Sequence, residues 1–182
     1  IWGWADIGQK VSVQFGDESA EVTAGGNKGR WEVTFPAREA SADPVKLTVS
    51  SGGETLEIEN IVIGDVWVMN GQSNMAWSLG KTLNGDFESV QAHQPLLRRL
   101  KISTNEQASP QDDIPADKIA DGGWVETSPE TAPGHTAIGY AFGSRIQRAL
   151  QIPVGIIENA RGGASLEALV PIHKFDDHPL AA

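Results

Sequence analysis

Apolar and polar positions alternate through the first third of the chain. Residues 11–15, 20–24, 31–35, 46–50 and 55–59 each show this alternation, and glycine, proline or asparagine stands near the breaks between them. A period of two turns one face of a strand toward a core and the other toward solvent. Short strands separated by turn residues at this spacing predict a β-sandwich.

The pattern changes near residue 62 to apolar runs that alternate with helical periodicity. Residues 62–69 and 153–157 have the length and composition of buried strands, and 96–102 reads as a further strand with partial burial. Residues 103–124 are polar and predict a long surface loop. Strands that alternate with helices predict a parallel sheet with helices on its faces.

The clearest helix is predicted over residues 137–150. Its buried face is predicted to consist of the apolar residues that recur at helical spacing: Ile138, Phe142, Ile146 and Leu150. Thr136 is placed to cap the first turn. Residues 86–93 predict a shorter helix and 166–170 a helical segment.

Composition narrows the function classes. The chain has 182 residues, 40% of them hydrophobic. Its net charge of −10 argues against binding of nucleic acid and disfavours docking to an anionic membrane. It has no cysteine and no apolar run of the roughly 20 residues that span a bilayer. No signal peptide precedes Ile1, so we expect a trimmed form of a secreted or periplasmic protein.

One candidate site follows the strand at 62–69. Gly71 breaks the run, and Ser73 stands between the strand and the first turn of a helix. Ligands of open α/β sheets bind at the carboxyl ends of strands, so Ser73 is well placed for a nucleophile. A helix N-cap is the alternative, because serine is among the preferred cap residues.

A second candidate site follows the strand at 153–157. Glu158 to Ser165 reads E-N-A-R-G-G-A-S, with paired glycines Gly162 and Gly163 before a helical segment. Glycines let a backbone N–H approach a reacting atom and stabilise negative charge that develops there. A tight turn that simply needs glycine is the alternative, whereas the patterns of phosphate-binding loops do not occur.

The run G-D-V-W from Gly64, followed by G-Q-S-N-M from Gly71 and by Trp77, resembles the first block of the SGNH hydrolases. It is most similar to their sialate O-acetylesterase and carbohydrate acetylesterase branch, and residues 159–165 resemble a later block. The resemblance implies that Ser73 is the nucleophile and that the N–H groups of Ser73 and Gly163 form the oxyanion hole.

The same resemblance implies further pocket residues, which are Gln72, Asn74, Arg161 and Gly162. Two of the positions depart from the family pattern: Ala76 replaces an acidic residue, and Arg161 replaces a tryptophan. In fold, the resemblance implies an α/β protein with an N-terminal β-sandwich over residues 1–61. Residues 62–182 would then be the first part of a three-layer, flavodoxin-like SGNH domain.

A serine nucleophile needs a base, usually a histidine held by a carboxylate. His93 and His135 are predicted to be solvated surface residues. Asp176 and His178 match the family's Asp/His segment only in its looser form, and they follow the third strand rather than the last. We therefore expect the catalytic pair and the rest of the sheet in the C-terminal part of the same enzyme, on a second chain or a further segment.

The predicted function is a carbohydrate O-acetylesterase that acts on an O-acetylated saccharide. No cofactor or metal is expected, because no group of ligands has metal-like spacing. One alternative is a non-catalytic carbohydrate-binding protein that uses Trp2, Trp4 and Trp31, although we expect these tryptophans in a core. Another is a different SGNH activity, such as a lipase or thioesterase.

Overall fold

The fold was established from a computed structural model, which describes residues 1–104, 109, 111–165, 167–171 and 174. The chain forms two compact units, Ile1–Gly64 and Asp65–Ala182. The sequence predicts a boundary after residue 61, whereas the last predicted strand of the first unit continues to Ile63. Residues 62 and 63 thus belong to the first unit, because Ile63 pairs with Ser41.

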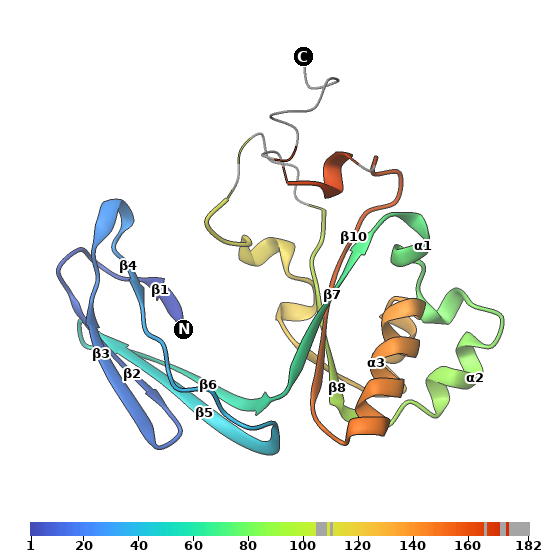
Figure 1. Ribbon diagram of the computed structural model, residues 1–182, viewed down its shortest axis with the longest axis horizontal. Coiled ribbons are helices and arrows are strands. Elements are labelled where there is room, and N and C mark those ends of the chain that lie inside the picture. Colours follow the sequence, from blue (N-terminus) through green and yellow to red (C-terminus); the bar gives the residue numbers. More distant parts are fainter. Residues whose placement is uncertain (105–108, 110, 166, 172–173, 175–182) are drawn as a thin grey trace. The chain divides into compact units, whose positions relative to one another are not determined.

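The first unit contains a four-stranded antiparallel sheet in the order β3-β2-β5-β6 (Figure 1). Its strands are β2 (Lys10–Phe15), β3 (Glu18–Thr23), β5 (Ser41–Ser51) and β6 (Glu54–Ile63). Each of them contains a segment predicted from alternation. The pattern locates the strand β2 well because its residues alternate between buried and exposed positions, whereas most of β6 is exposed.

In a second, two-stranded sheet, β1 (Trp2–Trp4) pairs with β4 (Arg30–Glu32). The short 3-10 helix η1 (Gly26–Lys28) precedes β4 in the chain. The core of this unit contains six buried residues: Val11, Val13, Ala24, Trp31, Val33 and Leu47. Trp31 is buried as expected. Trp2 and Trp4 are exposed instead, with their rings edge to face at 5.2 Å, so their expected place in the core is wrong.

The second unit contains a four-stranded mixed sheet in the order β7-β10-β8-β9. Its strands are β7 (Asp65–Gly71), β8 (Gln94–Lys101), β9 (Val125–Thr127) and β10 (Val154–Ala160). The central strand β10 is parallel to both β7 and β8, as predicted, whereas β9 is antiparallel to β8. The sequence pattern misses β9, because three residues are too few for a detectable alternation.

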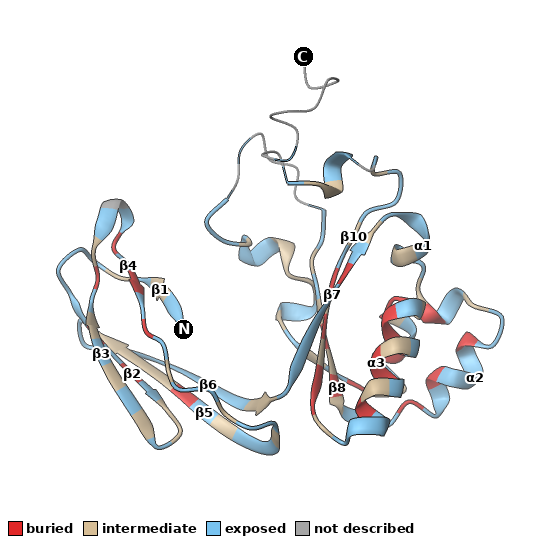
Figure 2. Cartoon of the chain, in the orientation of Figure 1, coloured by how far each residue is buried: buried red, intermediate tan, exposed pale blue. Residues whose placement is uncertain are grey.

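Helix α3 (Ala137–Leu150) has the predicted bounds, and the Thr136 hydroxyl caps it by accepting from the Gly139 N–H at 2.8 Å. Its predicted buried face is confirmed only in part: Phe142 and Ile146 are partly buried against the core, whereas Ile138 and Leu150 are exposed. The buried row is Gly139, Tyr140, Gly143, Ser144 and Gln147. Two residues of this row, Gly139 and Gly143, lie directly against Ile156 in β10, so the helix packs closely on the sheet. Figure 2 shows buried positions along α3.

Replacing Gly143 by alanine is expected to lower the free energy of unfolding by up to about 2 kcal/mol. A β-carbon there would lie 2.7 Å from Leu97 Cδ1 and 3.1 Å from Ile156 Cγ1, both in the core. Overpacking of this kind costs about 1–3 kcal/mol, of which about 1 kcal/mol is offset by alanine's better helix propensity. Urea unfolding measures the change, and Leu97→Val in the same chain should restore part of it. Equal or greater stability of Gly143→Ala would contradict the close packing.

Two shorter helices accompany α3, namely α1 (Ser73–Ala76) and α2 (Gly85–Val90). Helices α2 and α3 lie on the same side of the sheet (Figure 1). The described parts of the predicted loop 103–124 include two 3-10 helices, η3 (Ala116–Lys118) and η4 (Ala120–Gly122). Three more 3-10 helices complete the set of described helices: η2 (Leu79–Lys81), η5 (Ala132–Gly134) and η6 (Glu167–Leu169). The chain is thus an α/β protein with several sheets and few helices.

Candidate active site

Ser73 is presented at the end of β7. The strand ends at Gly71, whose φ of +152° is unusual for other residues, and α1 begins with Ser73. The N-cap position belongs to Gln72, so the alternative that Ser73 is the N-cap is wrong. The Ser73 side chain is exposed, and its hydroxyl donates to Gln72 Oε1 at 3.3 Å. The hydroxyl is therefore accessible to a substrate.

The glycine turn lies at the end of the neighbouring strand. β10 and β7 are paired in register up to Ala160 and Gly71, so their carboxyl ends coincide. The Arg161 N–H then donates to the Gly71 carbonyl at 2.9 Å and holds the turn against the end of β7. Gly163 has a φ of +79°, a conformation that favours glycine.

The two turns converge. A β-carbon at Gly162 would lie 3.9 Å from Ser73 Oγ, which places the backbone of the glycine turn directly beside the hydroxyl. No atom would lie within 4 Å of a β-carbon at Gly163, and the Gly163 N–H has no hydrogen-bond partner in the described part of the chain. An exposed hydroxyl close to a glycine turn is an arrangement that suits nucleophilic attack on a carbonyl.

The side chains predicted to line the pocket, Gln72, Asn74 and Arg161, are all exposed around this point. The predicted base candidates Asp176 and His178 lie outside the described residues. His93 is exposed after α2, as predicted. In the described structure, therefore, no histidine is hydrogen-bonded to Ser73.

His135 is not a surface residue, contrary to prediction, because it is fully buried beneath η5 and the sheet. Its Nε2 lies 3.1 Å from Thr127 Oγ1, whose own hydrogen goes to the Leu97 carbonyl at 2.7 Å, so the imidazole proton is on Nε2. Burial, with smaller contributions from the cations of Arg99 and Lys101, lowers the pKa of His135 from 6.5 to about 3. A neutral, enclosed imidazole cannot reach a substrate at Ser73.

Glu158 is the buried neighbour of His135. Its side chain is only 3% exposed, and Oε1 accepts from the Thr136 N–H at 2.6 Å and lies 4.0 Å from His135 Nδ1. Burial raises the pKa of the Glu158 carboxyl above its ordinary value. No role is predicted for Glu158 from the sequence. The signal that could have found it is an acidic residue directly after the four apolar or small residues Val154–Ile157 of a buried strand.

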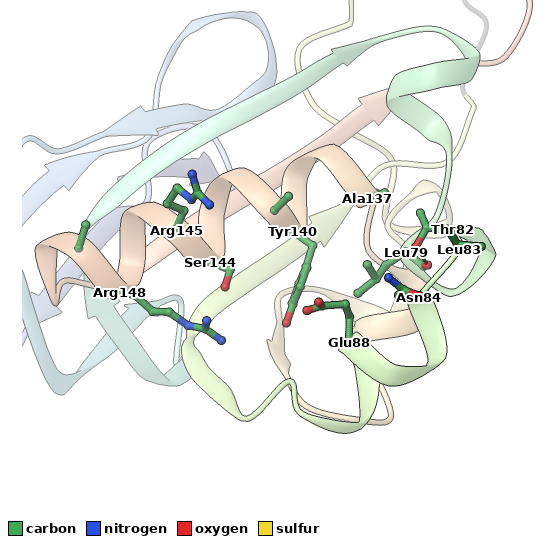
Figure 3. A pocket seen from close by; sticks show the side chains of 12 residues that line it. Leu79, Thr82, Leu83, Asn84, Glu88, Ala137, Tyr140, Ser144, Arg145 and Arg148 are labelled. Atoms are coloured by element: carbon green, nitrogen blue, oxygen red, sulfur yellow. Dashed lines mark hydrogen bonds between the residues drawn. The ribbon is translucent and has the colours of Figure 1, made fainter.

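A separate groove of about 780 Å³ runs along α3 and is faced by the segment around η2 and α2 (Figure 3). Tyr140 and Ser144 form part of its floor, and Arg145 and Arg148 lie toward one end. Ser73 and the other predicted site residues do not line this groove. The groove is therefore separate from the candidate site at the strand ends.

Two negative observations apply to the described residues only. Among them, no three or more histidine, aspartate or glutamate side chains are grouped so as to hold a metal ion. None of the helices in these parts of the chain combines the length and apolar character that crossing a membrane requires.

Comparison with known proteins relates this geometry to a class of enzyme. A carbohydrate acetylesterase from Xanthomonas citri has the same fold, with a TM-score of 0.88 and 30% identity over 98% of this chain and 40% of that one. No model of a protein family matches. The chain is thus related to the SGNH carbohydrate esterases, and the resemblance seen in the Gly64–Trp77 run is confirmed.

The curated relatives narrow this relationship. Sialate O-acetylesterases of Pongo abelii and Homo sapiens are each 28% identical to the chain over 184 aligned residues. The corresponding enzyme of Rattus norvegicus is 28% identical as well. Each alignment covers 92% of this chain but only 33–34% of the relative, so the chain spans about a third of the length of the enzymes it matches.

Proposed function

We propose that the chain belongs to a carbohydrate O-acetylesterase, similar to sialate O-acetylesterase, and contributes the serine nucleophile of its active site. The observation that carries the proposal is the position of the exposed Ser73 hydroxyl beside the Gly162–Gly163 turn. The relationship to carbohydrate acetylesterases supports the ester of an acetylated sugar as the substrate.

In the proposed mechanism Ser73 Oγ attacks the acetyl carbonyl, and a histidine base takes the hydroxyl proton. The N–H groups of Ser73 and Gly163 stabilise the oxyanion, a role in which one donor contributes roughly 10²–10³-fold in rate. The intermediate collapses, the sugar oxygen leaves with the proton from the histidine, and Ser73 carries the acetyl group. Water, activated by the same histidine, then hydrolyses this ester to acetate.

The base is proposed to come from a further part of the same enzyme. No described histidine contacts Ser73, and the relatives are about three times as long as the aligned region. Met69 contacts α3, so the alternate residues Val66 and Val68 face the opposite side of the sheet, where both are 58% exposed. Among the described strands β7 pairs only with β10, so its other edge is open. This open edge and the two exposed valines suit the packing of further polypeptide.

The finer fold is part of the proposal. The antiparallel sheet and the small β1-β4 sheet share one core, which supports a β-sandwich in the first unit. The parallel strands β7, β10 and β8, with α3 against them, support the first part of a three-layer SGNH domain in the second. The missing layer would cover Val66 and Val68.

Covalent labelling tests the function directly. The full-length protein, including the part that follows this chain, is treated with a fluorophosphonate and digested, and the modified peptide is identified by mass spectrometry. The expected result is a single adduct on Ser73, together with acetate release from an O-acetylated sugar and from an aryl acetate. Hydrolysis with the adduct on another residue, or no hydrolysis at all, would contradict the proposal.

A carbohydrate-binding protein without catalysis is the second candidate, and the exposed Trp2 and Trp4 favour it. Arg30 lies over the Trp2 ring, with its guanidinium carbon 5.9 Å from the ring centroid. Such a protein would bind saccharides but would neither release acetate nor react with the fluorophosphonate. The same experiment therefore separates the two candidates.

A further inference from the structure

Glu158 is connected to both turns of the candidate site, to one through its backbone and to the other through its side chain. It lies in β10, in register with Met69 of β7 on one side and Lys101 of β8 on the other. Its carbonyl accepts from the Ile102 N–H at 2.9 Å, which ties the backbone into the sheet. Only two residues separate Glu158 from Arg161, which is held to the end of β7. The backbone of Glu158 thus leads directly into the glycine turn.

The side chain of Glu158 reaches a different segment. Its carboxylate accepts from the Thr136 N–H at 2.6 Å, and Thr136 in turn caps α3. A buried acidic group is costly unless it is hydrogen-bonded, so a contact this short indicates that the carboxyl has a defined partner. The contact fixes the start of α3 relative to β10.

The segment around Thr136 also holds the chain that follows Ser73. Ser78 and Thr136 form an antiparallel bridge. The Leu79 N–H donates to the His135 carbonyl, and the Ala137 N–H donates to the Trp77 carbonyl, each at 2.8 Å. Residues 77–79 come directly after α1. The position of Ser73 is therefore set from one end by β7 and from the other by residues 135–137.

We propose that Glu158 is a positioning residue for the active site. Its backbone fixes the Gly162–Gly163 turn, and its carboxyl, through Thr136 and the bridge to Ser78, fixes the turn that carries Ser73. One buried group thereby sets the distance between nucleophile and oxyanion donor. Glu158 touches no reacting atom. The inference rests on the proposed esterase function.

The size of the effect follows from the sensitivity of catalysis to placement. Displacement of a reacting group by about 1 Å can cost on the order of 10²-fold in rate. Loss of the Glu158 acceptor would leave the Thr136 N–H buried without a partner, and the 135–137 segment would shift to satisfy it. The consequence for the enzyme is a lower kcat with little change in KM, because the substrate contacts remain.

The test compares Glu158→Gln, which keeps an acceptor oxygen, with Glu158→Leu, which removes it at similar volume. In the full-length enzyme we expect Glu158→Gln to stay within about 3-fold of the wild-type kcat, and Glu158→Leu to lose about 10- to 100-fold with KM unchanged. The rate of fluorophosphonate labelling at Ser73 should fall in parallel. Hydrogen exchange should accelerate at the Leu79 and Ala137 amides in Glu158→Leu.

The matched control is Ile146→Ala. Ile146 packs on the same core from the distal half of α3 and has no part in the bridge to residues 77–79. It should lower stability by leaving a cavity in the core, while kcat stays within about 3-fold of wild type, since neither turn is moved. If Glu158→Leu fails to fold, Glu158→Asp takes its place, because it retracts the carboxylate by one methylene. We expect it to lose kcat as well, but by a smaller factor.

Two results would overturn the positioning role. One is a folded Glu158→Leu enzyme, or failing that Glu158→Asp, with wild-type kcat and labelling rate. The other is a kcat loss no larger than that of Ile146→Ala, together with unchanged exchange at Leu79 and Ala137. Failure of the proposed function is a separate outcome, because it would appear as absent labelling of Ser73 in the wild-type enzyme.

Discussion

Replacing Ser73 by alanine is expected to abolish ester hydrolysis by the full-length protein and to leave its fold intact. Removal of a serine nucleophile can cost on the order of 10⁶-fold in kcat. The side chain is exposed, and within the described structure its hydroxyl makes one hydrogen bond, at 3.3 Å to the adjacent Gln72, so the change in stability should stay within about 0.5 kcal/mol. Acetate release and thermal unfolding measure the two effects.

Ser12→Ala is the control for this variant, because Ser12 is an exposed serine in β2 of the first unit. It should retain wild-type turnover. Saccharide binding should survive in Ser73→Ala, since that substitution removes no more than a hydroxyl group from the pocket. Wild-type turnover in Ser73→Ala would place the nucleophile elsewhere.

Acidification is expected to destabilise the protein through His135. The folded-state pKa of His135 is about 3, against about 6.5 for histidine in an unfolded chain. Between these values the unfolded chain binds a proton that the folded protein excludes, so the free energy of unfolding falls as pH falls. This group alone contributes a loss of about 2 kcal/mol by pH 5 and about 4 kcal/mol by pH 3.

Glu158 acts in the opposite direction. Its folded-state pKa is raised, so its contribution to stability is fully present below the ordinary glutamate pKa and is lost as pH rises through the raised value. Proton uptake by Glu158 therefore offsets part of the loss from His135. The cations of Arg99 and Lys101 lower both pKa values, whereas Asp121 raises that of Glu158.

Urea unfolding at pH 7, 6 and 5 separates the two groups. His135→Gln keeps a hydrogen-bond donor for Thr127 but cannot titrate, so its stability should fall less over this range than that of the wild type. The stability of Glu158→Gln should fall more than that of the wild type, because this variant lacks the compensating proton uptake by Glu158. His93→Gln, at an exposed histidine, should follow the wild-type curve. The same slope in His135→Gln and in the wild type would show that His135 does not titrate as proposed.

Helix α3 shows what periodicity can and cannot predict. Its bounds followed from the Thr136 cap and from the helical spacing of its apolar residues, which are local properties. Its buried face followed only in part, because Gly139 and Gly143 count as neutral in an apolar pattern yet lie directly against Ile156. Close packing of small residues depends on the partner surface, which a single sequence does not show.

The candidate site divides in the same way. That the turns at Ser73 and Gly162 would meet could be predicted, since each follows a parallel strand directly. The burial of His135 could not, because it follows a proline-glycine segment that reads as a surface turn. Its enclosure depends on Thr127, Leu97 and Glu158, which lie on three different strands.

The close contact of α3 with the sheet also constrains how relatives of this protein can diverge. A larger residue at Gly143 fits only where the side chain at Leu97 or Ile156 has become shorter, because all three compete for the same volume. A larger side chain on one side of the contact requires a smaller one on the other. Homologous sequences should therefore exchange these positions together, so that a lineage with alanine or serine at 143 carries a smaller partner on β8 or β10.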